Sequence, residues 1–99
     1  ETLTLAGLDF EIVHAPGHSP GCVMLVAEDV ALTGDVLFKG SIGRTDLPHS
    51  DHAAMQRSLR GPVWALDDAL AILPGHGPTS TMRRERATNP FLVAAGDVL

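Results

Sequence analysis

The chain has 99 residues, a net charge of −5 and 44% hydrophobic residues, which suits one small domain and is not the composition of a disordered chain. The acidic balance argues against a nucleic-acid partner, whose binding proteins usually carry a basic face, and weakly against an anionic membrane surface. No apolar run approaches the roughly 20 residues that a membrane-spanning helix needs.

The first half of the chain predicts four strands. Residues 2–5 and 8–13 alternate polar and apolar side chains around an Ala-Gly turn, which is typical of a β-hairpin. A loop punctuated by Pro and Gly covers residues 14–21. The apolar run of residues 22–29 then predicts a buried strand, and residues 30–35 predict the strand that returns beside it.

After the fourth strand, the sequence predicts a long loop and then a helix. The loop covers residues 36–49. Ser50 is a suitable N-cap for a helix over residues 51–59, whose apolar side chains recur at helical spacing. Gly61 and Pro62 are expected to end this helix.

The end of the chain predicts one more strand and a last helix. Residues 69–73 are a short apolar run, and Thr79 or Ser80 is the expected cap of a helix over residues 82–87. The Arg-Arg-Glu-Arg stretch of this helix is expected to be a solvated face, with Glu85 as a partner for arginine. Strands followed by a helix, a strand and a helix indicate an α/β fold with a mixed β-sheet and flanking helices.

The single cysteine and the first residue add two expectations. Cys22 alone excludes an internal disulfide framework, which fits a reducing compartment, so we expect a cytoplasmic location. The chain begins with Glu1 rather than Met, inside a segment that predicts a strand. We therefore expect residues 1–99 to be a piece of a longer protein.

Three candidate metal ligands stand beside strand ends, and each is next to a glycine. His18 precedes the strand of residues 22–29, Asp35 ends the following strand, and His76 lies just past residues 69–73. Loops held by a rigid sheet often carry functional residues, and these three converge if their strands are neighbours. Two imidazoles and a carboxylate suit Zn²⁺ or Fe²⁺. The alternative for each histidine is an ordinary solvated turn.

Three segments together resemble the metallo-β-lactamase superfamily. They are residues 15–21 (APGHSPG), residues 32–48 (LTGDVLFKGSIGRTDLP) and residues 72–92 (ILPGHGPTSTMRRERATNPFL). Their order and spacing look most like its short hydrolases similar to glyoxalase II. The resemblance covers nearly the whole chain and implies half of an αββα sandwich, the C-terminal portion of the domain, with a metal site at one edge of the two sheets.

The resemblance also implies a two-metal site in the complete protein. His18 and His76 would each bind one ion and Asp35 would bridge and orient them, with Zn²⁺ as the expected metal and iron or manganese as alternatives. The family's His-x-His-x-Asp-His loop, which supplies the other ligands, is absent from residues 1–99 and would belong to a missing N-terminal half. Because sheet faces and edges would be open without that half, we expect the isolated residues to be poorly stable, to aggregate or dimerise, and to be nearly inactive.

The implied reaction is hydrolysis of a small acyl thioester, such as S-lactoylglutathione, in which metal ions activate water and stabilise the oxyanion. In the glyoxalase II family the basic residue at the position of Arg44 contacts a carboxylate of glutathione, and a guanidinium suits that group. A pair with Asp46 that braces the loop is the alternative for Arg44. Lys39 is a second candidate for attracting an anionic thioester, although a solvated lysine is the favoured interpretation.

Two other functions compete with the hydrolase. Mononuclear iron persulfide dioxygenases share the fold and a loop that resembles residues 40–46 (GSIGRTD); in those enzymes His18 and Asp35 would bind iron and His76 would be a bystander. The other rival is a truncated module without catalytic activity, which the missing upstream motif supports. GSIGR at residues 40–44, where the dioxygenases have GCGR, and the long match over residues 73–92 together favour the hydrolase over the dioxygenase.

Overall fold

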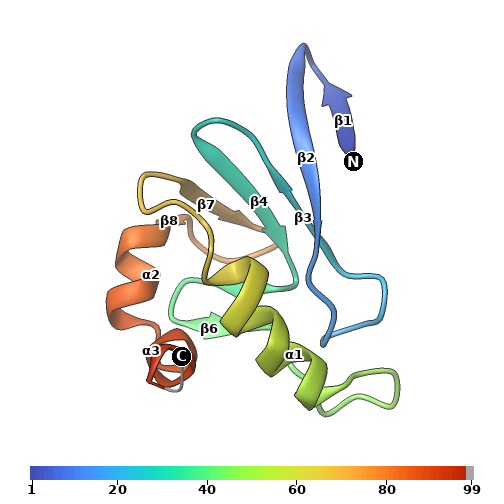
Figure 1. Ribbon diagram of the computed structural model, residues 1–99, viewed down its shortest axis with the longest axis vertical. Helices are drawn as coiled ribbons and strands as arrows, with labels where there is room; N and C mark the ends of the chain where they lie inside the picture. The colour runs from blue at the N-terminus through green and yellow to red at the C-terminus, as the bar shows by residue number, and fades with distance from the viewer. Residues whose placement is uncertain (98–99) are drawn as a thin grey trace.

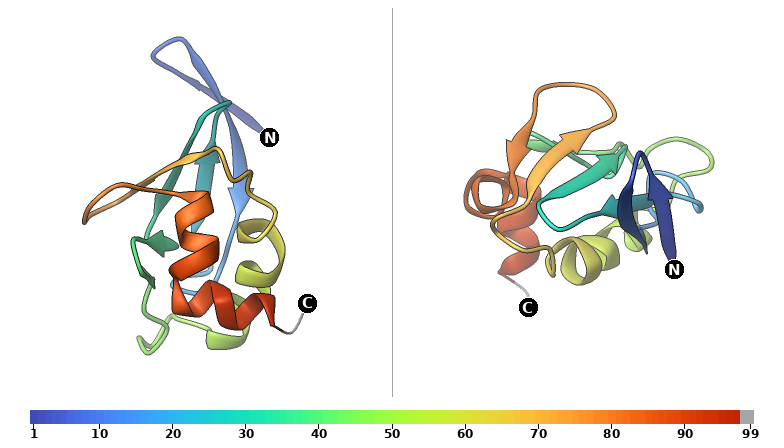
Figure 2. Two further views of the ribbon diagram at one scale, coloured as in Figure 1. Left: turned by 90° about the vertical axis from the view of Figure 1, so that its left-hand side faces the viewer. Right: turned by 90° about the horizontal axis from the view of Figure 1, so that it is seen from above.

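The computed structural model describes residues 1–97 as a six-stranded mixed sheet with helices on one side (Figures 1 and 2). The strand order is β1-β2-β3-β4-β7-β8. The sheet strands are β1 (Thr2–Leu5), β2 (Leu8–His14), β3 (Val23–Val26), β4 (Val30–Gly34), β7 (Ala71–Pro74) and β8 (Ser80–Thr81). A separate small hairpin consists of β5 (Leu37–Phe38) and β6 (Ser41–Ile42). The helices are α1 (His52–Ser58), the π-helix η1 (Leu59–Val63), α2 (Met82–Thr88) and α3 (Pro90–Gly96).

The pairing of β4 with β7 determines which loops meet. All other neighbours in the sheet are antiparallel, but β4 and β7 are parallel, with Val30 opposite Ala71 and Leu32 opposite Leu73. The carboxyl ends of two parallel neighbours lie at the same edge of a sheet. The residues that follow β4 and β7 are therefore brought together, as the sequence predicted.

The core fills the space between the sheet and the helices. Its largest members are fully buried, and each such side chain contributes roughly 1.5–3 kcal/mol relative to exposure. They are Met24 and Ile72 from the sheet, Leu37, Met55 and Leu59 from the segments that follow β4, and Met82 and Leu92 from α2 and α3. By contrast, the β1–β2 hairpin leaves Leu3, Leu5 and Leu8 exposed. In the same hairpin, however, Phe10 of β2 is buried and Val13 packs against the core.

The first helix begins and ends differently from the sequence expectation. Asp51, not Ser50, is the N-cap of α1 and accepts a hydrogen bond from the Ala54 N–H. The helical path also continues through Gly61 and Pro62 as η1. Pro62, which has no N–H to donate, lies inside this widened turn, where the Trp64 N–H donates to the Leu59 carbonyl at 3.1 Å.

The loop after β4 and the C-terminal third both contain elements that the sequence did not predict. Strands β5, β6 and β8 have two residues each, too short to show alternation. A further helix, α3, follows the helix over residues 82–87 that the sequence predicted as the last, with Asn89 as its N-cap and Pro90 in its first turn. Thr81 rather than Thr79 or Ser80 caps α2.

Glu85 corrects the expectation of a solvated charged face on α2. Its side chain is fully buried and accepts hydrogen bonds from neutral groups. The neighbouring Arg86 is the residue that forms an ion pair, with Asp68, and it also donates to the carbonyl oxygens of Trp64 and Leu66. The sequence pattern did not distinguish the buried position from the exposed ones.

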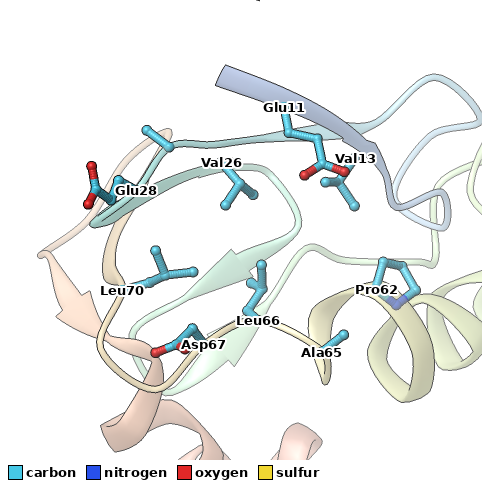
Figure 3. A pocket seen from close by; sticks show the side chains of 10 residues that line it. Glu11, Val13, Val26, Glu28, Pro62, Ala65, Leu66, Asp67 and Leu70 are labelled. Carbon is cyan, nitrogen blue, oxygen red and sulfur yellow. The ribbon is translucent and has the colours of Figure 1, made fainter. Parts of the chain in front are cut away.

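A cavity of about 350 Å³ lies between the ends of β2 and β3 and the segment after η1. Figure 3 shows Val26, Leu66 and Leu70 around it, with the carboxylates of Glu11 and Glu28 nearby. None of the candidate metal ligands lines this cavity. No helix within residues 1–97 has the length and apolar character to cross a membrane.

Candidate metal centre

The structure brings all three predicted ligands together around Asp35. The His18 Nε2 atom lies 3.7 Å from Asp35 Oδ2, and the His76 Nδ1 atom lies 3.7 Å from Asp35 Oδ1. The exposed fractions of the side chains differ: 21% for His18, 48% for Asp35 and 75% for His76. One carboxylate thus has a different imidazole beside each of its oxygens.

His18 is fixed by hydrogen bonds to the chain around it. Its Nδ1 atom lies 2.9 Å from the Arg44 carbonyl oxygen, which can only accept, so Nδ1 carries the hydrogen. Nε2, the ring nitrogen on the side of Asp35, is then the one left to bind a metal ion. The Ser50 hydroxyl donates to the His18 carbonyl at 2.8 Å, which explains why Ser50 does not cap α1.

Gly43 allows this arrangement. A Cβ at this position would overlap the Asp35 carbonyl oxygen and lie 3.1 Å from the His18 Cβ. The Gly43 N–H donates to the Val36 carbonyl at 3.2 Å. The loop that carries the Arg44 carbonyl can therefore lie directly against the segments of His18 and Asp35 only because residue 43 has no side chain.

His76 is held mainly by packing and by its glycine neighbours. Its ring centroid lies 4.7 Å from that of Phe38, with the planes tilted by 38°. The Gly75 N–H donates to the Gly34 carbonyl at 2.9 Å, which ties the two loops at their bases. Gly77 has φ of +89°, a conformation that favours glycine. The position of the His76 ring therefore depends on where Phe38 and this loop lie.

Each histidine–carboxylate pair has the separation that two ligands of one metal ion would have. Nitrogen and oxygen ligands of one tetrahedral zinc ion, at about 2.0–2.2 Å from it, are roughly 3.4 Å apart. Both histidine–carboxylate separations of 3.7 Å are close to this value and too long for a hydrogen bond. A backbone carbonyl on the second ring nitrogen, as in His18, is also the usual support of a metal-binding histidine.

The set is incomplete within the described chain. No group of three or more His, Cys, Asp or Glu side chains in residues 1–97 converges on a single point in a way that could hold an ion. Each imidazole instead pairs with a separate oxygen of Asp35, so each ion would have two ligands from these residues. Further ligands would have to come from outside the described chain.

Arg44 adopts the alternative that the sequence left open, a pair with Asp46. Its Nε and Nη2 atoms donate to the two carboxylate oxygens at 2.7 and 2.9 Å. Hydrogen bonding first, and then charge, raises the pKa of Arg44, and hydrogen bonding from Arg44 is the largest cause of the lowered pKa of Asp46. Both side chains are exposed, so the pair braces the loop weakly.

A cavity of about 280 Å³ opens beside the three ligands. Arg44 lines it, whereas Lys39 is exposed on the β5–β6 turn and does not. Phe38, Ser41 and Ile42 from the small hairpin complete the wall. Sequence reasoning missed these hairpin residues, and the available signal was their position between the predicted ligand Asp35 and the predicted substrate residue Arg44.

The sequence model described as the Metallo-beta-lactamase superfamily matches residues 1–76. This chain belongs to the metallo-β-lactamase superfamily. The hydroxyacylglutathione hydrolase GloC of Haemophilus influenzae is 46% identical over 94 residues, covering 93% of this chain and 44% of that protein. This confirms the resemblance to hydroxyacylglutathione hydrolases. The chain spans about half the length of the curated relatives it matches.

Two solved structures confirm the fold class. BLEG-1 B3 metallo-beta-lactamase superposes with a TM-score of 0.85 and 42% identity, over 92% of this chain and 44% of that one. TTHA1623, in a di-iron-bound form, superposes with a TM-score of 0.77 and 41% identity, over 90% and 44% of the two chains. The described residues therefore form about half of a metallo-β-lactamase fold, in a superfamily that binds metal ions.

Proposed function

We propose that the protein to which this chain belongs is a zinc-dependent hydrolase of small acyl thioesters, with hydroxyacylglutathiones as the first substrates to test. The observation that carries the proposal is Asp35, whose two carboxylate oxygens each face a different imidazole at 3.7 Å. The 46% identity to a hydroxyacylglutathione hydrolase supports the choice of substrate. Iron or manganese in place of zinc, and a cytoplasmic location, belong to the same proposal.

The residues of this chain have distinct roles in the proposed reaction. His18 would bind a metal ion through Nε2, because its other ring nitrogen is held by the Arg44 carbonyl. Asp35 presents one oxygen toward each histidine. When bound, zinc ions supply activated water near neutral pH and stabilise the developing oxyanion. The remaining ligands come, in this proposal, from an N-terminal half.

The cavity beside the ligands is the proposed substrate site. Phe38 and Ile42 give it apolar walls suited to the carbon chain of an acyl group. Arg44 lines it, and because Asp46 takes the Nε and Nη2 donors, Nη1 is the group proposed to bind a substrate carboxylate. Lys39 lies outside the lining and would act only by long-range attraction.

The test uses the full-length protein purified from its natural reading frame. We expect S-lactoylglutathione hydrolysis that a chelator abolishes and zinc restores. Asp35→Asn should lower kcat/KM by more than about a hundredfold, since even residues that only orient ligands are worth ten- to a hundredfold. Asp29→Asn, at an exposed turn, is the matched control and should change little.

Two outcomes would contradict the proposal. A metal-loaded full-length protein that hydrolyses no acyl thioester is not the enzyme proposed here. Oxygen uptake with glutathione persulfide by the iron-loaded protein would assign the dioxygenase activity instead. The isolated 99 residues are expected to be nearly inactive in both assays, because the ligand set within the described residues is incomplete.

A further inference from the structure

Two buried polar residues, which attach the β5–β6 hairpin to α2, have no role in the function proposed so far. Glu85 of α2 and Asn89, at the junction of α2 and α3, are both fully buried. None of the ion pairs within residues 1–97 includes Glu85. Burying a carboxylate without a cationic partner is costly unless several donors satisfy it. The burial of the Glu85 carboxylate therefore needs an explanation.

The Glu85 carboxylate joins the two loops that border the His76 side of the metal centre. Its Oε1 atom accepts from the Gly40 N–H at 2.8 Å, at the turn of the β5–β6 hairpin. Its Oε2 atom accepts from the Ser80 hydroxyl at 2.5 Å, at the end of the loop that follows His76. Gly40 has φ of +75°, and its N–H lies in the turn rather than in the hairpin ladder.

Asn89 binds the same hairpin through backbone carbonyl groups of the hairpin. Its side-chain amide donates to the Ser41 carbonyl at 3.0 Å, to the Phe38 carbonyl at 3.3 Å and to Glu85 Oε1 at 3.0 Å. The amide orientation is settled by the network, because the Asn89 Oδ1 atom accepts from the Phe91 N–H. The turn and both strands of the hairpin are therefore attached to α2 at one buried point.

The hairpin that is attached in this way also contacts His76. Phe38 is the residue whose ring lies against the His76 imidazole, and its backbone carbonyl is one of the groups that Asn89 binds. His76 itself is 75% exposed and lies in a glycine-flanked loop. We propose that Glu85 and Asn89 are positioning residues that place His76 for metal binding through Phe38 and Ser80. This inference rests on the proposed function for its metal, and on the structure alone for the position of His76.

The test compares three variants of the full-length protein: Glu85→Ala, Glu85→Gln and Arg86→Ala. Glutamine keeps the length of the side chain and one acceptor oxygen, and its amide can donate to the Ser80 hydroxyl. Arg86→Ala is the matched control, because it removes interactions of the next residue on α2 that lead to Trp64, Leu66 and Asp68, away from the site.

The first measurement is zinc binding to the metal-free protein by calorimetry. Residues that orient metal ligands are typically worth ten- to a hundredfold in metal affinity. We therefore expect Glu85→Ala to weaken one of two zinc sites by about tenfold or more, Glu85→Gln to restore most of the affinity, and Arg86→Ala to leave both sites unchanged. Equal zinc affinities in Glu85→Ala and the unsubstituted protein would overturn the proposal.

The second measurement needs neither zinc nor substrate. In the metal-free protein, the Phe38 ring should shift the proton signals of the His76 imidazole upfield, and Glu85→Ala should reduce that shift while Arg86→Ala keeps it. An unchanged shift in a folded Glu85→Ala protein would overturn the proposal. A protein that shows the expected NMR change but binds no zinc would contradict the proposed function and leave the positioning role supported.

If Glu85→Ala does not fold, a milder variant tests the positioning role instead. Ser80→Ala removes one hydrogen bond from the same carboxylate and leaves the Gly40 and Asn89 bonds in place. A weakening of one zinc site by a few-fold, with a partial loss of the upfield shift, would support the proposal. No change in either quantity would overturn it.

Discussion

The two histidines of the metal centre are held in opposite ways. His18 is largely covered; its Nδ1–H donates to the Arg44 carbonyl, and its own carbonyl oxygen accepts from the Ser50 hydroxyl. His76 is mostly exposed, and its ring is in contact with one aromatic side chain. The orientation of His18 is therefore set by neighbouring backbone, whereas that of His76 depends on a hairpin that is itself fixed from α2.

This difference predicts which kind of substitution disturbs the His18 side of the site and which disturbs the His76 side. On the His18 side, the decisive feature is the close approach of the residue 43 backbone to Asp35 and His18. On the His76 side, it is the chain of contacts from Glu85 and Asn89 through the hairpin to Phe38. The first side should respond to added volume and the second to removed contacts.

Gly43→Ala should have the largest effect. The added Cβ would overlap the Asp35 carbonyl oxygen and crowd His18, and a backbone group cannot move aside as a flexible side chain can. Overpacking of this kind costs about 1–3 kcal/mol or more, so we expect a lower free energy of unfolding and weaker zinc binding at the His18 side, measured by denaturant titration and calorimetry. Gly21→Ala is the control, since nothing lies within 4 Å of its Cβ position. Equal behaviour of the two variants would show that the close approach is not required.

Phe38→Ala should have an intermediate effect, confined to the His76 side. Loss of the ring leaves the exposed imidazole without its packing partner, so we expect one zinc site to weaken by about tenfold and the other to stay unchanged. Phe91→Ala, on an exposed part of α3, is the matched control. Weakening of both sites by the same factor would mean that Phe38 supports the whole edge rather than His76.

The candidate ligands could be predicted because their signal is local. A histidine or aspartate flanked by glycine at the end of an apolar strand is visible in sequence, and parallel pairing of β4 with β7 then brings Asp35 and His76 together. The resemblance to a known family supplied the roles. Five of the six strands in the sheet have four to seven residues, which is long enough to show their pattern, whereas β8 has two and was missed.

The supporting residues could not be predicted, because their signal is not local. Glu85 and Gly40 are 45 positions apart, and Asn89 and Ser41 are 48 apart. Glu85 also stands between arginines, where a charged residue is usually exposed. A buried carboxylate is recognised only when its donors are known, and those of Glu85 come from three separate places: the β5–β6 turn, β8 and the junction of α2 and α3.

Asp46→Asn should have the smallest effect. It tests whether the Arg44–Asp46 pair helps to hold the Arg44 carbonyl against His18. The Arg44–Asp46 pair lowers the pKa of the Asp46 carboxyl, so its contribution to stability is present above the ordinary pKa of 3.8 and is lost as the pH falls through the lowered value. We expect a small difference in Tm between the two proteins at neutral pH, which shrinks in acid and in high salt because both side chains are exposed. Zinc affinity should change by about threefold or less, because the Arg44 carbonyl, not its guanidinium, holds His18. A larger loss of zinc affinity would show that the exposed pair, rather than the close approach at Gly43, keeps that carbonyl in place.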